Sequence, residues 1–171
     1  KTSLCNRYMR KGFVEDYIMT VGADVSFKTL QVGKRKIKLQ IWDIAGQPCF
    51  EAVRKSYFGG SIGALCVYDI TRPETLENSR NWIEELWKHN EKGKVPVILL
   101  GNKIDLRDSF PSPVTSEQGQ ALADKLLDPI KDVRLKIRHL ETSAKIGKNV
   151  DEAFQMLAEE IVKYVESQLA L

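Results

Sequence analysis

The chain has 171 residues and a formal net charge of +3 at pH 7, with 43% hydrophobic and 29% charged residues. These values are ordinary for one globular domain and argue against a disordered chain, while so small a net charge gives no reason to expect a nucleic-acid partner. No apolar run approaches the roughly 20 residues of a membrane-spanning helix and no signal peptide is recognisable, so we expect one cytoplasmic domain over residues 1–171.

The first predicted element is an amphipathic helix from Lys1 to about Arg10. A Lys-Thr pair at a helix start is typical of the end of the phosphate-binding loop G-x-x-x-x-G-K-[ST]. The glycines of that motif are absent, and any helix can begin with Lys1-Thr2, so the pair alone is weak evidence. Residues 12–22 follow as an ordered loop without a regular hydrophobic period, and long connections of this kind are often functional.

The next elements are two strands, Asp24 to Val32 and Arg35 to Asp43, joined by a tight Gly33-Lys34 turn and therefore antiparallel. In the second strand apolar and polar residues alternate, which is typical of a half-buried strand. Asp43 closes it with a carboxylate, Gly46 allows a ligand to approach the backbone, and Gln47 offers an uncharged donor and acceptor. These residue types suit a Mg²⁺-bound phosphate and an oriented water molecule.

Strands and helices alternate through the rest of the chain. We expect buried strands at 62–70 and 96–100 and a further strand at 133–140, each followed by an amphipathic helix. Capping boxes at Thr71–Glu74 and Thr115–Gln118 predict two of the helix starts, and Asn149 is the predicted cap of the last. The alternation predicts an α/β fold with a doubly wound, mostly parallel sheet, one antiparallel strand, and helices on both faces.

Polar clusters follow several of these strands, and the carboxyl ends of parallel strands meet at one edge of a sheet. In Asn102-Lys103-Ile104-Asp105 the carboxylate can accept two hydrogen bonds from guanine, and the aliphatic stem of Lys103 can lie against the base. Adenine lacks this donor pair, and such a site can discriminate by roughly 10⁴-fold. In isolation the segment would indicate only a polar loop, but its position and its neighbours favour a guanine site.

Five segments together make the chain similar to small GTPases of the Ras superfamily, and within it to the Rab branch. They are Lys1-Thr2, Thr20-Val21-Gly22, Trp42 to Gln47, Asn102 to Asp105 and Glu141 to Lys145. The resemblance covers residues 1 to about 163 and implies a P-loop NTPase G domain that binds GTP or GDP with Mg²⁺. A complete domain of that family has a central strand and a Gly-rich loop before Lys1. Without them the sheet would lack its middle strand, so we expect such residues to precede Lys1; the alternative is a truncated domain, which should neither fold well nor bind nucleotide.

The resemblance also implies a role for each matching residue. The implied catalytic residues are Lys1 at the β- and γ-phosphates, Gly46 at the γ-phosphate, and Gln47 at the hydrolytic water. The implied Mg²⁺ ligands are Thr2, Thr20 and Asp43. The implied nucleotide-binding set is Lys1, Thr2, Ser3, Phe13, Tyr17, Thr20, Gly46, Asn102, Lys103, Asp105, Ser143, Ala144 and Lys145.

The same resemblance implies a monomeric molecular switch. Contacts from Thr20 and Gly46 exist only while a γ-phosphate is present, so hydrolysis releases both loops. No arginine is assigned to the transition state, so unaided hydrolysis should be slow, on the order of 10⁻⁴ s⁻¹, and we expect an activating protein and an exchange factor.

Rab proteins present three aromatic residues to effectors. Trp42 and Tyr57 match, and Phe27 could replace the third, which is Val25 here. A Trp42 that only packs beneath the switch loops is the alternative.

Two other functions remain open. One is a scaffold that holds nucleotide permanently without cycling, which Pro48 supports because proline stiffens the catalytic loop. The other is a nucleoside kinase, against which the guanine-type Asn102 to Asp105 segment argues.

The three cysteines lack metal-ligand spacing and are expected as reduced thiols. The last residues, 166–171, contain no cysteine, so no lipid anchor is expected on this chain, although peripheral contact with membranes is left open.

Overall fold

The computed structural model describes residues 1–11, 20–47, 49, 51–128, 132 and 134–169. Phe13, Tyr17 and Pro48 of the predicted site lie outside these residues. The elements, in chain order, are α1 Thr2–Tyr8, β1 Ala23–Val32, β2 Arg35–Ile44, α2 Glu51–Phe58, β3 Ala64–Asp69, α3 Pro73–His89, β4 Val97–Asn102, the 3₁₀ helix η2 Ile104–Ser109, α4 Ser116–Leu127, β5 Ile137–Thr142 and α5 Val150–Leu169.

The described strands form two sheets. β1 and β2 pair antiparallel along their whole length, from Ala23 opposite Ile44 to Val32 opposite Arg35. β3, β4 and β5 form a parallel sheet in that order, with β5 at its edge. The predicted α/β fold with parallel strands and one antiparallel partner is confirmed. Among the described strands no hydrogen-bonded pairing joins β2 to β3.

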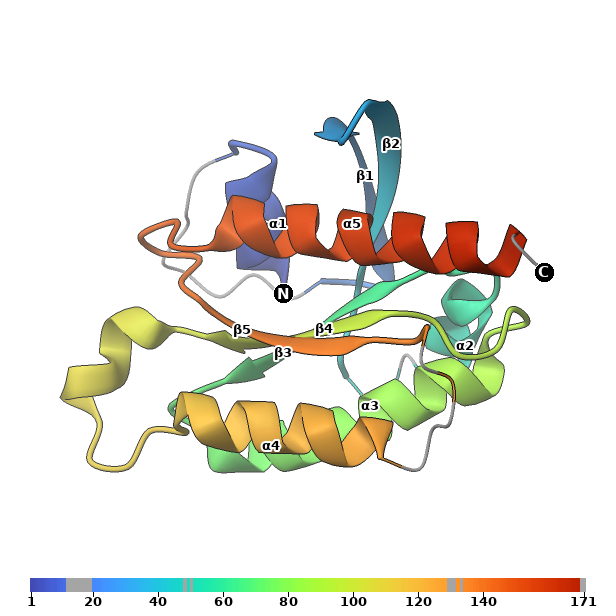
Figure 1. The fold of residues 1–171 in the computed structure, drawn as a ribbon. Coiled ribbons are helices and arrows are strands. Elements are labelled where there is room, and N and C mark those ends of the chain that lie inside the picture. The colour runs from blue at the N-terminus through green and yellow to red at the C-terminus, as the bar shows by residue number, and fades with distance from the viewer. Residues whose placement is uncertain (12–19, 48, 50, 129–131, 133, 170–171) are drawn as a thin grey trace.

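Helices cover both faces of the parallel sheet (Figure 1), with α1 and α5 on one side and α3 and α4 on the other. β4 is the centre of this arrangement because Val97, Ile98, Leu99 and Leu100 are all 0% exposed. Side chains of a strand alternate between its faces. Val97 and Leu99 therefore join the core under α3 and α4, whereas Ile98 and Leu100 join the core under α1 and α5.

The start of α4 confirms one predicted capping box. The Gln118 amide donates to Thr115 Oγ1 over 3.3 Å, and Gln118 Oε1 accepts from the Thr115 amide over 2.8 Å. The capping box predicted at Thr71 is wrong. α3 begins at Pro73, its N-cap residue makes no side-chain cap, and the Thr71 hydroxyl instead donates to Asp69 Oδ1 over 2.7 Å. A proline at the first helical position supplies the fixed φ that starts the helix.

Several predicted ends also differ from the structure. α1 ends at Tyr8, before the expected Arg10, and Arg10 has a left-handed φ of 61°. β5 begins at Ile137 although its apolar pattern starts earlier. Asn149 precedes α5 with a φ of 57°, and its side-chain amide donates to the Glu141 carbonyl over 2.8 Å, which ties the helix start to the end of β5. None of the helices in the described part of the chain is both long and apolar enough to cross a membrane.

Tyr68 and His139 form a hydrogen-bonded pair between the sheet and α4. Their Tyr68 Oη to His139 Nε2 distance is 2.8 Å, and Tyr68 is 2% exposed. A Cβ atom at Gly119 of α4 would lie 2.3 Å from His139 Nε2 and 2.5 Å from the Tyr68 hydroxyl. Burial lowers the pKa of His139 below its ordinary 6.5. The pair is therefore neutral at pH 7 and depends on a glycine in the helix above it.

All three cysteines are free, as predicted. Burial raises the pKa of the Cys5 thiol to about 12 and that of Cys66 to about 11. Both thiols are therefore protonated at neutral pH, which removes the reactivity of a thiolate.

Candidate functional site

Three oxygen-bearing side chains from distant parts of the chain meet at the end of β2. The Thr2 hydroxyl donates to Asp43 Oδ2 over 2.5 Å and shares a 2.7 Å hydrogen bond with the Thr20 hydroxyl. Thr2 opens α1, Thr20 precedes β1, and Asp43 is 6% exposed near the carboxyl end of β2. The structure therefore brings together all three residues that the sequence predicts as metal ligands.

The donor set of this corner fits Mg²⁺. Two hydroxyls and one carboxylate are hard oxygen ligands, which Mg²⁺ prefers and which it commonly shares with substrate phosphates and water. Within the ranges that the structure describes, no cluster of three or more His, Cys, Asp or Glu side chains forms an alternative metal site. A bound Mg²⁺ would take up the contacts that Thr2, Thr20 and Asp43 now make with each other.

Lys1 and Gly46 approach one another beside this corner. A Cβ atom built on Gly46 would lie 2.8 Å from Lys1 Nζ, so the ammonium group occupies the space that a side chain would need. The backbone amide of Gly46 and the Lys1 ammonium group are thus neighbours, and both are donors suited to phosphate oxygens. Ser3 follows in the first turn of α1 and is half-buried.

Gln47 is held through its backbone by a residue that the sequence motifs do not indicate. Arg54 Nη1 of α2 donates to the Gln47 carbonyl over 3.1 Å. The guanidinium group is buried, lies 4.4 Å from the Trp82 ring and is 3.7 Å from Glu85 Oε2, and both of these residues belong to α3. Arg54 therefore connects the predicted catalytic loop to α3.

The predicted base-binding segments meet at the ends of β4 and β5. Asn102 Oδ1 accepts hydrogen bonds from the Ala144 amide at 3.1 Å and from the Thr142 hydroxyl at 3.3 Å. The Ser143 hydroxyl donates to Asp105 Oδ1, and Ser143 itself is fully buried. These bonds join the two segments that the sequence assigns to guanine into one unit.

Two further residues support this unit. Arg7 of α1 donates through Nε to the Ala144 carbonyl over 2.8 Å and through Nη2 to the Lys145 carbonyl. Lys103, which has a left-handed φ of 73°, places its ammonium group 2.6 Å from Asp69 Oδ2. Burial alone would raise the pKa of Asp69, but the hydrogen bonds from Lys103 and Thr71 outweigh it and lower that pKa. Asp69 is thus an ionised partner for Lys103.

The sequence motifs missed Asp69 and Arg7 for different reasons. Asp69 ends β3 in the same way that Asp43 lies near the end of β2, so the rule that strand ends gather at one edge could have found it. Arg7 lies in the last turn of a short helix, and no local pattern distinguishes it from a solvated arginine.

Aromatic side chains gather on the outer face of the β1–β2 hairpin. The rings of Trp42 and Tyr57 have centroids 5.1 Å apart with an interplanar angle of 33°. Val25 is the cross-strand partner of Trp42, and Phe27 lies two residues further along the same face. Trp42 is 42% exposed and Phe27 52% exposed, so neither is buried beneath a loop in the described structure. We refer to Phe27, Trp42 and Tyr57 as the aromatic patch.

Comparison with known proteins identifies the family. The model of the Ras family matches residues 1–163. This chain belongs to the Ras family of small GTPases. It is 40% identical over 163 residues to GTP-binding protein ypt2 of Schizosaccharomyces pombe, an alignment that covers 95% of this chain and 76% of that protein. It is 38% identical over 162 residues to human Ras-related protein Rab-8B, with 95% and 72% covered, and 39% identical over 162 residues to rat Ras-related protein Rab-13, with 95% and 74% covered.

The relatives agree with the resemblance to the Rab branch seen in the sequence motifs. In this small GTPase the guanine-type segment follows β4, where Asp105 contacts Ser143, and the Asp43 to Gln47 segment ends β2, where Asp43 contacts Thr2. Members of this family bind guanine nucleotide and hydrolyse GTP. The roles of the site residues are therefore assigned for that reaction.

Proposed function

We propose that this small GTPase is a Mg²⁺-dependent switch that slowly hydrolyses GTP to GDP and phosphate and offers its switch segments to effectors while GTP is bound. The observation that carries the proposal is the convergence of Thr2, Thr20 and Asp43 next to Lys1 and Gly46. A carboxylate, two hydroxyls, an ammonium group and a backbone amide are the parts that hold a metal-bound triphosphate.

Each phosphate-binding residue has a separate task in this proposal. Thr2, Thr20 and Asp43 would hold Mg²⁺, which would supply positive charge to the phosphates. Lys1 binds oxygens of the β- and γ-phosphates, and the Gly46 amide binds a γ-phosphate oxygen. Gln47 orients a water molecule whose oxygen bonds to the γ-phosphorus while the bond to the β–γ bridging oxygen breaks. GDP and inorganic phosphate are the products, and the water proton leaves with the phosphate.

Guanine selection is assigned to the segments at the ends of β4 and β5. Asp105 accepts from the base, Lys103 covers it, and Asn102 acts by holding Ala144 and Thr142 in place. Ser143 orients the Asp105 carboxylate, and Arg7 holds the backbone of Ala144 and Lys145. A half-buried carboxylate aimed at guanine would lose its two hydrogen bonds from the base if adenine bound instead, which is why we expect strong selectivity.

The switch requires partners of three kinds. Arg54 makes its contacts with the Gln47 carbonyl, Trp82 and Glu85, so we do not assign it to the transition state, and an activating protein is expected to supply positive charge. An exchange factor is expected because nucleotide held by so many contacts leaves slowly. The aromatic patch is the proposed effector surface. We place the protein in the cytoplasm as a monomer, with peripheral contact to membranes.

Single-turnover hydrolysis tests this function against a scaffold that never cycles. Purified protein is loaded with radiolabelled GTP, and released phosphate is followed for wild type, Gln47→Ala and the control Gln40→Ala, which alters the same residue type on an exposed position of β2. We expect slow release by wild type and the control and a rate at least ~10-fold lower for Gln47→Ala. Equal rates for wild type and Gln47→Ala would refute the catalytic assignment, and no turnover by wild type would favour the scaffold.

A further inference from the structure

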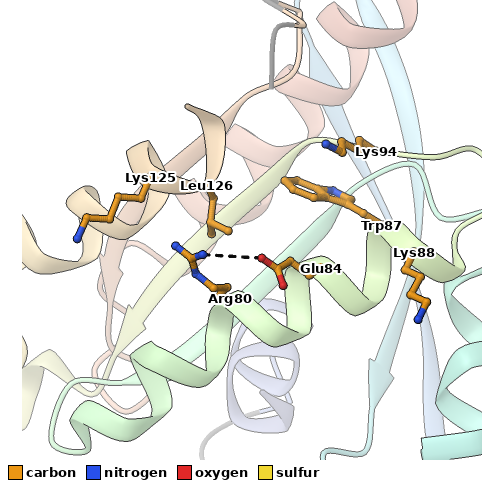
Figure 2. A pocket seen from close by; sticks show the side chains of 7 residues that line it. All are labelled: Arg80, Glu84, Trp87, Lys88, Lys94, Lys125 and Leu126. Carbon is orange, nitrogen blue, oxygen red and sulfur yellow. Dashed lines mark ion pairs between the residues drawn. The ribbon is translucent and has the colours of Figure 1, made fainter. Parts of the chain in front are cut away.

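A groove of about 310 Å³ lies between α3 and α4, and none of its lining residues belongs to the aromatic patch. Figure 2 shows Lys125 and Lys88 at opposite ends of this group of side chains, with Leu126, Glu84 and Trp87 between them. Leu126 is 4% exposed and forms an apolar floor. The lining residues of this α3–α4 groove are Arg80, Glu84, Trp87, Lys88, Lys94, Lys125 and Leu126.

The groove is strongly cationic. Four of its seven lining residues are Lys or Arg, all of them exposed, and Glu84 is the only acidic one. The Glu84 carboxylate is 4.0 Å from Arg80 Nη1, which neutralises the one negative charge within the group. The chain as a whole carries only +3, so an excess of positive charge on this scale within one groove is a local feature.

Helix dipoles explain only part of this charge. Lys88 and Lys125 lie in the last turns of α3 and α4, where a cation is favoured by about 0.3–1 kcal/mol. Arg80 lies in the middle of α3 and Lys94 precedes β4, so neither position gains from a helix C-terminus. The Lys94 ammonium group lies 5.3 Å from the Trp87 ring centroid, which keeps it at the groove.

Trp87 determines what kind of contact the groove can make. Its indole N–H donates to the Val95 carbonyl over 3.1 Å, so the polar atom of the side chain is already used within the fold. The ring therefore offers the groove an apolar surface beside Leu126. An apolar centre with cations at both ends fits a ligand that has one apolar group between negative charges.

We propose that the α3–α4 groove binds an acidic segment of a partner protein, with an aliphatic side chain against Trp87 and Leu126 and carboxylates at Arg80, Lys94 and Lys125. A concave site with a buried apolar floor fits an extended polypeptide better than a flat lipid surface. The spread of cations along the groove fits several charges in a row. The groove lies at the amino end of β4, because Lys94 precedes Val97, whereas the nucleotide-binding residues follow its carboxyl end. The partner can therefore bind without displacing nucleotide.

Fluorescence polarisation tests the proposal with a short fluorescein-labelled peptide of Glu and Asp around a central Leu. A reference peptide carries Gln and Asn in place of the acids. The proteins are wild type, the groove variant Lys94→Glu/Lys125→Glu, and the matched control Lys34→Glu/Lys36→Glu on the β1–β2 hairpin. Both variants alter exposed lysines and change the net charge equally. Sedimentation with phosphatidylserine vesicles is measured in parallel, and melting temperatures confirm that each variant is folded.

We expect the acidic peptide to bind wild type and the hairpin control alike, roughly tenfold more weakly to the groove variant, and more weakly as salt is raised. We also expect little binding of the reference peptide. Equal losses in the two variants would show a general effect of net charge and overturn the proposal. Vesicle binding that depends on Lys94 and Lys125, without peptide binding, would overturn it in favour of a membrane surface.

Discussion

Removing the side-chain amide of Asn102 should weaken the fold and the proposed guanine site together. Asn102 is 9% exposed, and its Oδ1 accepts from the Ala144 amide at 3.1 Å and from the Thr142 hydroxyl at 3.3 Å. Thr142 is fully buried and Ala144 is 3% exposed. In Asn102→Ala both donors lose their acceptor, in a place where water does not readily replace it.

The expected loss of unfolding free energy in Asn102→Ala follows from these two lost hydrogen bonds. A buried donor left without a partner costs about 1–3 kcal/mol, so two of them cost about 2–6 kcal/mol if nothing relaxes. Thr142→Val is the matched comparison because it removes one hydroxyl, keeps the shape of the side chain, and leaves Asn102 bonded to Ala144. We expect about 1 kcal/mol from that change.

Urea unfolding followed by circular dichroism measures both variants against wild type. The loss of unfolding free energy in Asn102→Ala should exceed that in Thr142→Val, with equal denaturant dependence in all three proteins. GDP affinity should also fall more in Asn102→Ala, since the Ala144 backbone is no longer held. If Asn102→Ala is as stable as Thr142→Val, Asn102 does not join the two segments as we describe.

Three further predictions concern other parts of the molecule. Trp42→Ala should lower the free energy of unfolding by only about 1 kcal/mol, because the side chain is half-exposed. In pull-downs it should abolish the interactions that GTP-loaded protein makes and GDP-loaded protein does not. If those interactions remain, the aromatic patch is not the effector surface. Gly119→Ala should lower the melting temperature, because the new Cβ atom would clash with His139 and Tyr68 at a cost of about 1–3 kcal/mol. Helix propensity alone predicts the opposite, a higher melting temperature. His139 is neutral in the folded protein and protonates more readily in the unfolded chain, so the free energy of unfolding should fall as pH drops below 6.5. Urea titrations at several pH values should show a weaker pH dependence for His139→Gln. An unchanged pH dependence would exclude His139 as its source.

Local patterns were sufficient for most of the fold. Alternation of polar and apolar residues predicted β1 and β2 to within one residue at each end, and helical periodicity predicted the buried stripes of α3 and α5. The capping box of α4 is confirmed because both of its hydrogen bonds are local. The same pattern failed at α3, where Thr71 bonds to Asp69 across the turn and Pro73 starts the helix.

Contacts between distant segments were harder to predict. The meeting of Thr2, Thr20 and Asp43 was expected from a family motif and from the rule that strand ends share an edge. Arg54 and Arg7 were missed because their partners, the Gln47, Ala144 and Lys145 carbonyls, are backbone atoms that leave no mark in the sequence. The α3–α4 groove was missed for a related reason, since its cations are spread over α3, α4 and the segment before β4.

We propose that one edge of the fold binds a guanine nucleotide with Mg²⁺. The decisive experiment is calorimetric titration of the purified protein, freed of bound nucleotide, with GDP and with ADP in the presence and absence of Mg²⁺. We predict GDP binding that is at least ~10³-fold tighter than ADP binding and that weakens when Mg²⁺ is withheld. Equal affinities for GDP and ADP, or GDP binding that is indifferent to Mg²⁺, would contradict the assignment of Asp105 to guanine or of Thr2, Thr20 and Asp43 to the metal.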